Sequence, residues 1–164
     1  MQSRFLIFLG ALTAIIFSAG CGTGVRGADQ EQGEFRSYVD RFEKESLEHG
    51  RDLKGLAHTV PVQFGETKPT DFAVCRVSVF GEPTIDVNKA KWGLIDEVTK
   101  EQVIYHELGH CILHREHDAS VVSLHSNDLD SGVNVPKSVM NPYLVPVSAY
   151  QAHRSLYVSE LFAQ

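Results

Sequence analysis

The sequence predicts one small α+β domain, in which an amino-terminal helix, a short mixed β-sheet, a second long helix and a closing helix share one core. Two observations predict this class. Apolar residues recur at helical spacing in three separate segments, whereas the stretch between residues 56 and 87 contains short extended runs bounded by turn residues. Residues 34–164 are enough for the core of one domain, and they contain no internal repeat.

Residues 1–20 have the composition of a secretory signal peptide. Arg4 precedes an apolar run at residues 5–17, and small residues follow directly before Cys21. The run is too short for a comfortable transmembrane helix. Small residues before a cysteine resemble a bacterial lipobox, so we expect Cys21 to be lipidated and the chain to be exported and anchored in the cell envelope, in the outer membrane or facing the periplasm. Ordinary cleavage near residues 20–22, which would leave a soluble exported protein, is the alternative.

Residues 22–33 are glycine-rich and polar and are expected to form a flexible tether between the membrane and the domain. The chain carries 15 basic and 21 acidic residues, a formal net charge of −6. Without residues 1–20 the net charge is −7, which is −6 minus the one positive charge of Arg4. No cluster of lysine and arginine is present, which argues against a nucleic-acid partner, and we expect a monomer.

The first helix is predicted at residues 34–50, where an aromatic and aliphatic stripe recurs at helical spacing and Gly50 ends the helix. A small sheet is predicted next, because three extended segments follow one another with glycine and proline in the turns between them. These segments are Leu56–Phe64, Phe72–Phe80 and Thr84–Val87.

The second long helix is predicted to begin near Thr99, where Thr99 and Gln102 fit a capping box. Residues 118–137 are expected to form a solvated loop, and residues 148–162 a closing helix with its own capping box at its start. Three residues in the loop with oxygen atoms in their side chains could suggest calcium, but their spacing is not that of an EF-hand, so calcium stays unsupported. They are Asp128, Asp130 and Asn134.

His106, Glu107 and His110 form the pattern His-Glu-x-x-His. On a helix, residues i and i+4 lie one above the other on the same face, so both histidines can direct a ring nitrogen at one Zn²⁺. Glu107 lies beside them, where its carboxylate could hold a water molecule on the metal and accept its proton. The bare pattern arises by chance in on the order of one chain in a hundred, so it needs support from its surroundings.

A continuous helix cannot supply a third ligand, because His117 would lie roughly 10 Å beyond His110 along the axis. The helix must therefore end soon after His110, and the chain must turn back. We predict that His114 lies at or near the left-handed conformation in this turn, since histidine tolerates positive φ better than most residues. His117 is the preferred third ligand, and three alternatives stay open, in the order Glu116, Asp118 and His125.

Residues 138–143 read Ser-Val-Met-Asn-Pro-Tyr. Together with His-Glu-x-x-His and the later histidine, this segment resembles the metzincin family of zinc peptidases, in which a tight Met-turn places a methionine beneath the metal. The chain differs from the metzincin pattern at two positions. It has Leu113 where the pattern has glycine and Glu116 where the pattern has its last histidine, so that His117 comes one residue late.

The resemblance implies a metzincin-like zinc endopeptidase domain over residues 34–164 that cleaves a protein or peptide substrate. One catalytic Zn²⁺ would be held by His106, His110 and His117, with Glu107 as the general base. Met140 would pack under the metal, and Tyr143 would line the substrate pocket. In that family a strand before the zinc helix forms the rim of the cleft and pairs with the substrate backbone, and residues 84–88 are expected in that place.

Two further functional readings remain open on the sequence. A fourth protein ligand, Glu116 or Asp118, would close the site and make the chain a non-catalytic, zinc-stabilised envelope lipoprotein that binds a protein or envelope component. A metal-dependent hydrolase of a non-peptide bond is not excluded. The cysteines also leave two states open, because an exported compartment permits a Cys75–Cys111 disulfide, while two buried thiols would serve packing equally well.

Overall fold

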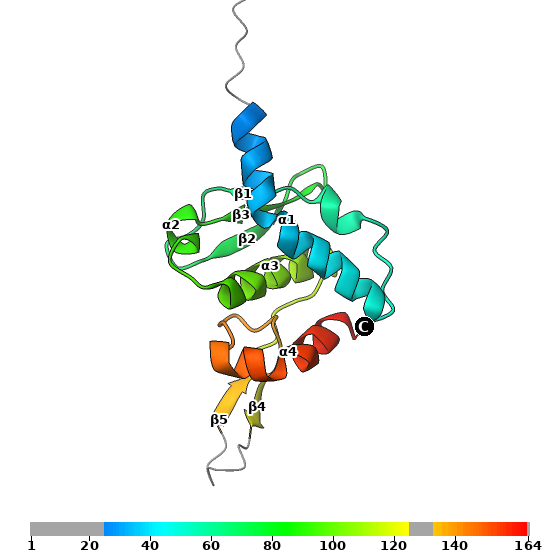
Figure 1. Cartoon of the computed structure of the whole chain (residues 1–164), viewed down its shortest axis with the longest axis vertical. Helices are drawn as coiled ribbons and strands as arrows, with labels where there is room; N and C mark the ends of the chain where they lie inside the picture. Colours follow the sequence, from blue (N-terminus) through cyan, green and yellow to red (C-terminus); the bar gives the residue numbers. More distant parts are fainter. Residues whose placement is uncertain (1–24, 125–132, 164) are drawn as a thin grey trace, which may run out of the picture.

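The computed structural model describes residues 25–124 and 133–163. It is an α+β domain in which α3 (Glu97–Cys111) crosses the centre, with a three-stranded sheet on one side and α4 (Val147–Phe162) on the other (Figure 1). The predicted signal peptide, the predicted lipidated Cys21, and the loop residues His125, Asp128 and Asp130 lie outside the described residues. None of the helices in the described part of the chain is long and apolar enough to cross a membrane.

The first helix, α1, runs from Val25 to Glu48, so its predicted start at residue 34 is wrong. Residues 25–33, which we expected to belong to a flexible tether, form its first turns. Residues 28–32 read Ala-Asp-Gln-Glu-Gln, and alanine, glutamine and glutamate have favourable helix propensities that offset the glycines beside them. Such residues can extend a helix that packing has already nucleated.

Two aromatic side chains of α1 join it to the rest of the core. Phe35 packs edge-on against Phe64 and Trp92, with ring centroids 5.0 and 5.1 Å apart. Phe42, which is fully buried, packs edge-on against Tyr105 and Phe162 at 5.2 and 5.0 Å. Because these partners lie on the sheet, on the short helix α2 (Lys89–Trp92), on α3 and on α4, the predicted aromatic stripe is the feature that gathers the elements around one core.

The sheet has the strand order β1–β3–β2, formed by β1 (Val62–Phe64), β2 (Ala73–Val77) and β3 (Pro83–Val87). β1 pairs with β3 in parallel, and β2 pairs with β3 antiparallel. The predicted first strand is shorter than expected, because residues Leu56–Thr59 form a 3-10 helix instead. The expectation that residues 84–88 form the rim of the cleft is also wrong, since β3 lies in the middle of the sheet and β2 forms the edge.

The predicted start of α3 near Thr99 is two residues late. The helix begins at Glu97 after the short helix α2 (Lys89–Trp92), and its N-cap is Asp96, whose Oδ1 accepts a hydrogen bond of 2.7 Å from the backbone amide of Thr99. Aspartate and threonine are both good caps, and the earlier one is used here. α4 likewise begins one residue before the predicted capping box, with Pro146 at its N-cap and no side-chain capping bond.

Residues 118–137, predicted as a loop, contain the two strands of an antiparallel hairpin, β4 (Val121–Leu124) and β5 (Val133–Pro136). Further backbone bonds continue this pairing from Lys137 to Ser120 at 3.0 Å and from Asp118 to Met140 at 3.0 Å. The hairpin therefore connects the segment after α3 to residues 138–143. In Figure 1 it projects at the end of the molecule beyond α4.

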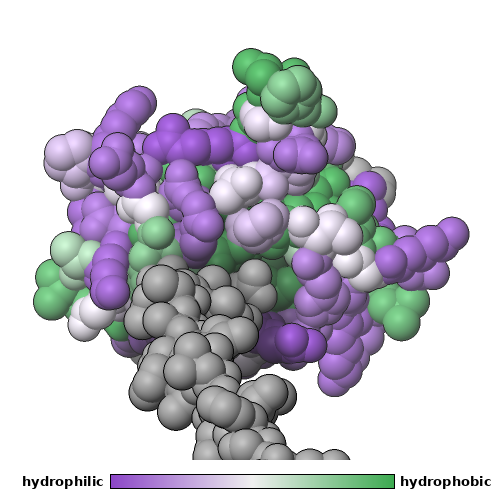
Figure 2. Space-filling view, turned by 90° about the horizontal axis from the view of Figure 1, so that it is seen from above, coloured by the Kyte–Doolittle hydropathy of each residue, from purple (hydrophilic) through white to green (hydrophobic). Residues whose placement is uncertain are grey.

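The face of the molecule seen in Figure 2 is mostly hydrophilic, and its apolar side chains form separate small patches. Among large apolar side chains in the described residues, Val79 and Phe80 in the turn between β2 and β3 are the most exposed, at 95% and 88%. Apolar side chains scattered over a surface in this way are normal for a folded domain.

Candidate metal centre

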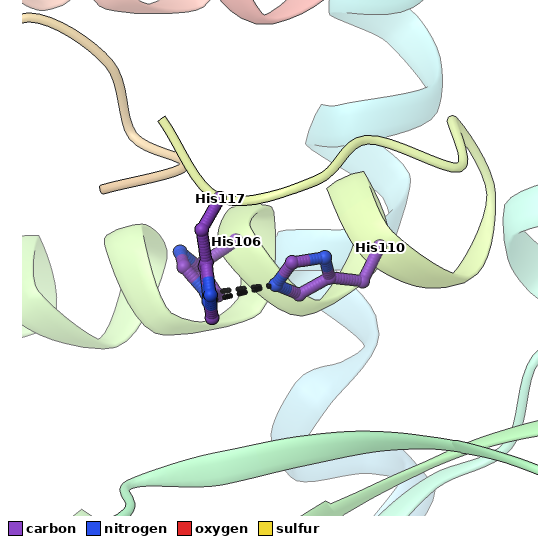
Figure 3. A group of neighbouring side chains, drawn as sticks. All are labelled: His106, His110 and His117. Atoms are coloured by element: carbon purple, nitrogen blue, oxygen red, sulfur yellow. Dashed lines mark hydrogen bonds between the residues drawn. The ribbon is translucent and has the colours of Figure 1, made fainter. Parts of the chain in front are cut away.

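α3 places His106 and His110 one turn apart on the same face, as the motif predicts. Their Nε2 atoms lie 3.1 Å from each other. In Figure 3 the two rings project from successive turns of the helix, and His117 comes from the segment that returns along it. The Nε2 atom of His117 lies 3.2 Å from each of the other two. The structure thus gathers three imidazole nitrogens in a nearly equilateral triangle.

The return of His117 depends on a sharp turn directly after the helix. α3 ends at Cys111, and His114 has a φ of 53°, the left-handed conformation that we predicted for it. The backbone amide of Arg115 then bonds back to the carbonyl of Gly109 at 3.0 Å. Histidine can take this conformation at modest cost, which is why the turn forms without the glycine of the metzincin pattern.

Two backbone carbonyls fix the protonation of the helical histidines. The Nδ1 atom of His106 lies 2.8 Å from the carbonyl oxygen of Val139, and Nδ1 of His110 lies 2.6 Å from that of Arg115. A carbonyl oxygen only accepts hydrogen bonds, so both Nδ1 atoms carry the proton and donate it. Both Nε2 atoms therefore present lone pairs to the centre of the triangle, which is the arrangement of metal-binding histidines.

The triangle fits a metal ion in size and in chemistry. The lone pairs of His106 and His110 face each other at 3.1 Å, and the Nε2 atom of His117 lies 3.2 Å from both, so a cation at the centre would relieve the repulsion between them. Imidazole nitrogens at about 2.0–2.1 Å from a tetrahedral zinc would lie about 3.3 Å apart, close to the separations found here. Burial also lowers the pKa of His106 to about 4 and lowers that of His110, so both rings stay neutral, as ligands must be.

The described residues contribute only these three histidines to the group that could hold a metal ion. Glu116, the first alternative to His117, has an exposed side chain and is not a member of the group. Asp118 is not a member either, since its Oδ1 accepts a hydrogen bond of 2.9 Å from the backbone amide of Ser120. His125, the last alternative, lies outside the described residues.

Glu107 lies on the side of α3 that faces β2, and it is 7% exposed. Its Oε2 atom accepts a hydrogen bond of 2.6 Å from the backbone amide of Cys75. Burial raises the pKa of this carboxyl to about 7, with the charge of Asp71 acting in the same direction and the Cys75 amide opposing it. A carboxyl with such a pKa can both accept and release a proton near neutral pH.

The segment predicted as a Met-turn packs against α3, the helix that carries the two candidate ligands. Met140 is fully buried, and a Cβ atom added to Gly109 would lie only 2.4 Å from its Sδ atom. The absence of a side chain at Gly109, directly before His110, therefore lets Met140 approach the helix closely. The same segment supplies the Val139 carbonyl to His106, so the methionine turn and the ligand helix form one packed unit.

A cleft of about 670 Å³ opens in front of the histidines and Glu107. The residues that line it include several of β2, together with Pro142 and Leu144. Tyr143 does not line this cleft and is 78% exposed, so its predicted place in the substrate pocket is wrong. Its backbone amide bonds to Oδ1 of Asn141 at 3.0 Å, and this turn directs the neighbouring side chains, but not the tyrosine, toward the cleft.

β2 presents an unpaired backbone edge to the cleft. In the antiparallel register Val74 lies opposite Asp86 and Arg76 opposite Thr84, and Ser78 continues the same pairing by donating to the carbonyl of Glu82 at 2.9 Å. Backbone groups alternate along a strand, so those of Ala73, Cys75 and Val77 point away from β3. The bond from the Cys75 amide to Glu107 follows from this orientation.

Cys75 and Cys111 form a disulfide, with their Cα atoms 5.8 Å apart. Of the two states that the sequence left open, the structure contains the bridge. Cys111 lies four residues after Glu107 on α3, so the two residues occupy the same helix face, opposite β2. The bridge and the Cys75–Glu107 hydrogen bond therefore join the same strand to the same face of the helix.

Sequence reasoning missed three residues that support the site. Arg115 and Ser138 both bond to Glu160 of α4, at 45 and 22 residues from it in the sequence. No local pattern predicts contacts at such separations. Ser138 lies inside the Met-turn motif, which was the one available signal, although the motif does not reveal the partner of its hydroxyl group.

No protein-family model matches the chain, and no solved structure matches it. A protein of Aquifex aeolicus (strain VF5), described only as uncharacterized, is 27% identical to it over 97 residues. This match covers 55% of the chain and 66% of the relative, slightly less than two thirds of the relative's length. The description of this relative names no activity.

Proposed function

We propose that this domain is a zinc-dependent endopeptidase. The observation that carries the proposal is the triangle of three Nε2 atoms with a buried carboxylate, Glu107, beside it in an open cleft. Backbone carbonyls fix the tautomers of two of these histidines, as is usual for histidines that bind a metal ion, and this supports the proposal. Imidazole ligands suit zinc, and three protein ligands leave the fourth position for water and substrate.

Zinc in this triangle would lower the pKa of a bound water and polarise the carbonyl group that is attacked. Glu107 would accept the proton of that water and later donate it to the leaving amine, a sequence for which its pKa of about 7 is suited. Protonation of the amine completes the cleavage, since an amine anion is a poor leaving group.

A peptide in extended conformation is the substrate that suits this cleft. The unpaired edge of β2 offers the backbone groups of Ala73 and Val77 to an added strand, and Cys75 between them already donates its amide to Glu107. A peptide that pairs with this edge would run past the histidines with one carbonyl within reach of the metal. The apolar side chains of Pro142 and Leu144, which also line the cleft, would contact its side chains.

A non-catalytic zinc-stabilised lipoprotein is the alternative function. It would require a fourth protein ligand to close the site. Within the described residues the group of candidate ligands holds three members, and Asp118 is already bonded to Ser120. This arrangement favours the endopeptidase.

The experiment that tests the function combines metal analysis with a conservative substitution. Purified protein dialysed against metal-free buffer should contain about one zinc per chain and should cleave members of a peptide library. Glu107→Gln should keep the zinc and lose about 10²- to 10⁴-fold in kcat/KM, the usual contribution of a general acid–base group. Glu116→Gln, one residue before the third ligand, is the matched control and should keep both. Full activity of Glu107→Gln would exclude Glu107 as the base.

We also propose that the domain acts outside the cytoplasm, anchored through Cys21. The signal-like residues 1–20 and the small residues before Cys21 support this, and so does the Cys75–Cys111 bridge, because disulfides persist in oxidising compartments. Cys21→Ser should move the protein from the detergent phase to the aqueous phase. Unchanged partitioning would exclude the lipid anchor.

A further inference from the structure

The two carbonyls that orient the helical histidines belong to segments far apart in the chain. Arg115, whose carbonyl accepts from His110, lies in the turn after α3, and Val139, whose carbonyl accepts from His106, lies in the Met-turn. Neither carbonyl is part of a helix or strand, so its position depends on what holds its segment. Both segments must be fixed for the two Nε2 lone pairs to meet at one point.

One residue of α4, Glu160, holds both segments. The Nη1 atom of Arg115 donates to its backbone carbonyl at 2.8 Å, and the Nη2 atom donates to its Oε1 atom. Its other carboxylate oxygen, Oε2, accepts a hydrogen bond of 2.6 Å from the hydroxyl of Ser138. That hydroxyl in turn accepts the backbone amide of Met140 at 3.0 Å. Each carboxylate oxygen of Glu160 is thus connected to one of the two segments.

These contacts are sheltered from solvent. The side chain of Arg115 is 8% exposed, that of Glu160 is 25% exposed, and Ser138 is fully buried. A largely buried guanidinium cannot easily find another partner, and removing its carboxylate would leave its charge unpaired. The hydrogen bonds around Glu160 therefore hold one arrangement. That arrangement fixes the positions of the Arg115 and Val139 carbonyls, which accept from His110 and His106.

We infer that Glu160 is a positioning residue of the metal centre, which acts on His110 through Arg115 and on His106 through Ser138 and the Met-turn. The inference rests on metal binding by the three histidines, as proposed above. Outer partners of metal ligands typically contribute 10- to 100-fold to metal affinity, because they fix the ring orientation and the tautomer of each ligand. Glu160 lies 43 residues after His117 in the sequence and contacts none of the three histidines. It would nevertheless make such a contribution, through Arg115 and Ser138.

Glu45 offers a matched control. It is also a largely buried carboxylate that accepts from one arginine and one hydroxyl group, the Nη2 atom of Arg154 at 3.1 Å and the hydroxyl of Tyr105 at 2.8 Å. None of these contacts involves the turn after α3 or the Met-turn. Glu45→Gln and Glu160→Gln therefore remove the same kind of charge from similar surroundings. Only Glu160→Gln alters the hydrogen bonds that hold the Arg115 and Val139 carbonyls in place.

The test measures zinc affinity by competition with a chromophoric chelator, together with the urea unfolding of the metal-free protein. Glu160→Gln should bind zinc about 10- to 100-fold more weakly than the parent protein. Glu45→Gln should bind it with the parent affinity even where its metal-free form is equally destabilised. The visible absorption of the cobalt-substituted protein should change in Glu160→Gln alone, because it reports on ligand geometry and not on stability.

A second variant covers the case in which Glu160→Gln fails to fold. Ser138→Ala keeps the Arg115–Glu160 ion pair and removes only the link to the Met-turn, so its zinc affinity should fall by a smaller factor. Parent-like affinity in a folded Glu160→Gln, or in Ser138→Ala, would overturn the inference and leave the endopeptidase proposal standing. Failure of the parent protein to bind zinc would overturn both.

Discussion

Cys75 is bonded twice to α3, the helix that carries His106 and His110, because its backbone amide donates to Glu107 at 2.6 Å while its sulfur is joined to Cys111. One residue of the edge strand therefore positions both the proposed general base and the end of the helix that carries the ligands. The strand that would receive the substrate and the helix that would hold the metal cannot move independently while the disulfide is intact.

Removing the disulfide should destabilise the protein without removing the metal site. The bridge closes a segment of 36 residues, for which the chain-entropy model gives about 4 kcal/mol. Cys75→Ala/Cys111→Ala should lower the urea midpoint accordingly and keep zinc, since neither sulfur belongs to the histidine group. The rate of peptide cleavage should fall by a larger factor than the zinc content per chain, because the bridge joins β2 to the helix face that carries Glu107. Parent-like activity at a temperature where the variant is folded would show that the bridge is not needed to align β2 with Glu107.

Gly109→Ala should disturb the site through Met140. The new Cβ atom would lie 2.4 Å from the Sδ atom of Met140 and 3.3 Å from Cδ1 of Leu161, and both side chains are fully buried. Overpacking of this kind costs about 1–3 kcal/mol. Chemical unfolding of the metal-free protein measures this cost, and zinc affinity should fall as well because Val139 precedes the displaced methionine.

Gly93 provides the control for this substitution. Its backbone is in the right-handed helical region, and the nearest atom to an added Cβ is a backbone oxygen at 3.9 Å. Gly93→Ala should change the free energy of unfolding by no more than about 0.5 kcal/mol in either direction, as most surface substitutions do. Equal losses at the two glycines would mean that the contact between Met140 and Gly109 is not the cause.

His117→Ala should lower zinc affinity by more than about 100-fold, beyond the range usual for outer partners of a ligand. The reason is that the Nε2 atom of His117 forms one corner of the triangle, at 3.2 Å from each of the other two. Glu116→Ala, the neighbouring substitution on the same turn, should leave the affinity unchanged. Competition with a chelating dye measures both. The reverse order of the two effects would reassign the third ligand to Glu116.

The parts of the site that the sequence predicts are those set by local geometry. A helix places His106 and His110 one turn apart on the same face. The rise along its axis carries later residues too far away to be a third ligand, so the chain must turn back. The positive φ of His114 and the return of His117 follow from that requirement. Residues 138–143, predicted as a Met-turn, and the aromatic stripe of α1 are also local patterns. Each of these features is determined by residues that lie close together in the sequence.

The errors concern pairings between distant residues. Nothing in the sequence of β3 places it between β1 and β2, since strand order depends on which edges the connections and the core allow. The hairpin of β4 and β5 is stabilised by backbone hydrogen bonds that continue as far as Met140. Val121 and Val122 are both partly exposed, so β4 lacks the alternation of buried and exposed residues by which a strand is recognised in a sequence. The bond between Arg115 and Glu160 spans 45 residues. A single sequence contains no signal for such contacts.

The pH dependence of the metal-free protein should reveal the opposed effects of His106 and Glu107. Burial lowers the pKa of His106 from 6.5 to about 4, so the unfolded chain binds more protons at this residue than the folded protein does. The contribution of His106 therefore lowers the free energy of unfolding as the pH falls from about 6.5 to 4. Burial raises the pKa of Glu107 from 4.5 to about 7, so the folded protein binds more protons at this residue than the unfolded chain does. The contribution of Glu107 therefore lowers the free energy of unfolding as the pH rises from about 4.5 to 7. The windows overlap, and the two contributions offset each other.

Glu107→Gln removes one of the two contributions and should expose the other. In the presence of a chelator, the variant should be more stable than the parent above pH 7, because it no longer buries a carboxylate charge. Its stability should then fall more steeply than that of the parent between about pH 6.5 and 4, since only the histidine effect remains. Urea unfolding at several pH values measures both slopes. Parallel curves for the two proteins would mean that Glu107 titrates in the folded state as it does in the unfolded chain, and its burial beside Cys75 would then not be the cause of a raised pKa.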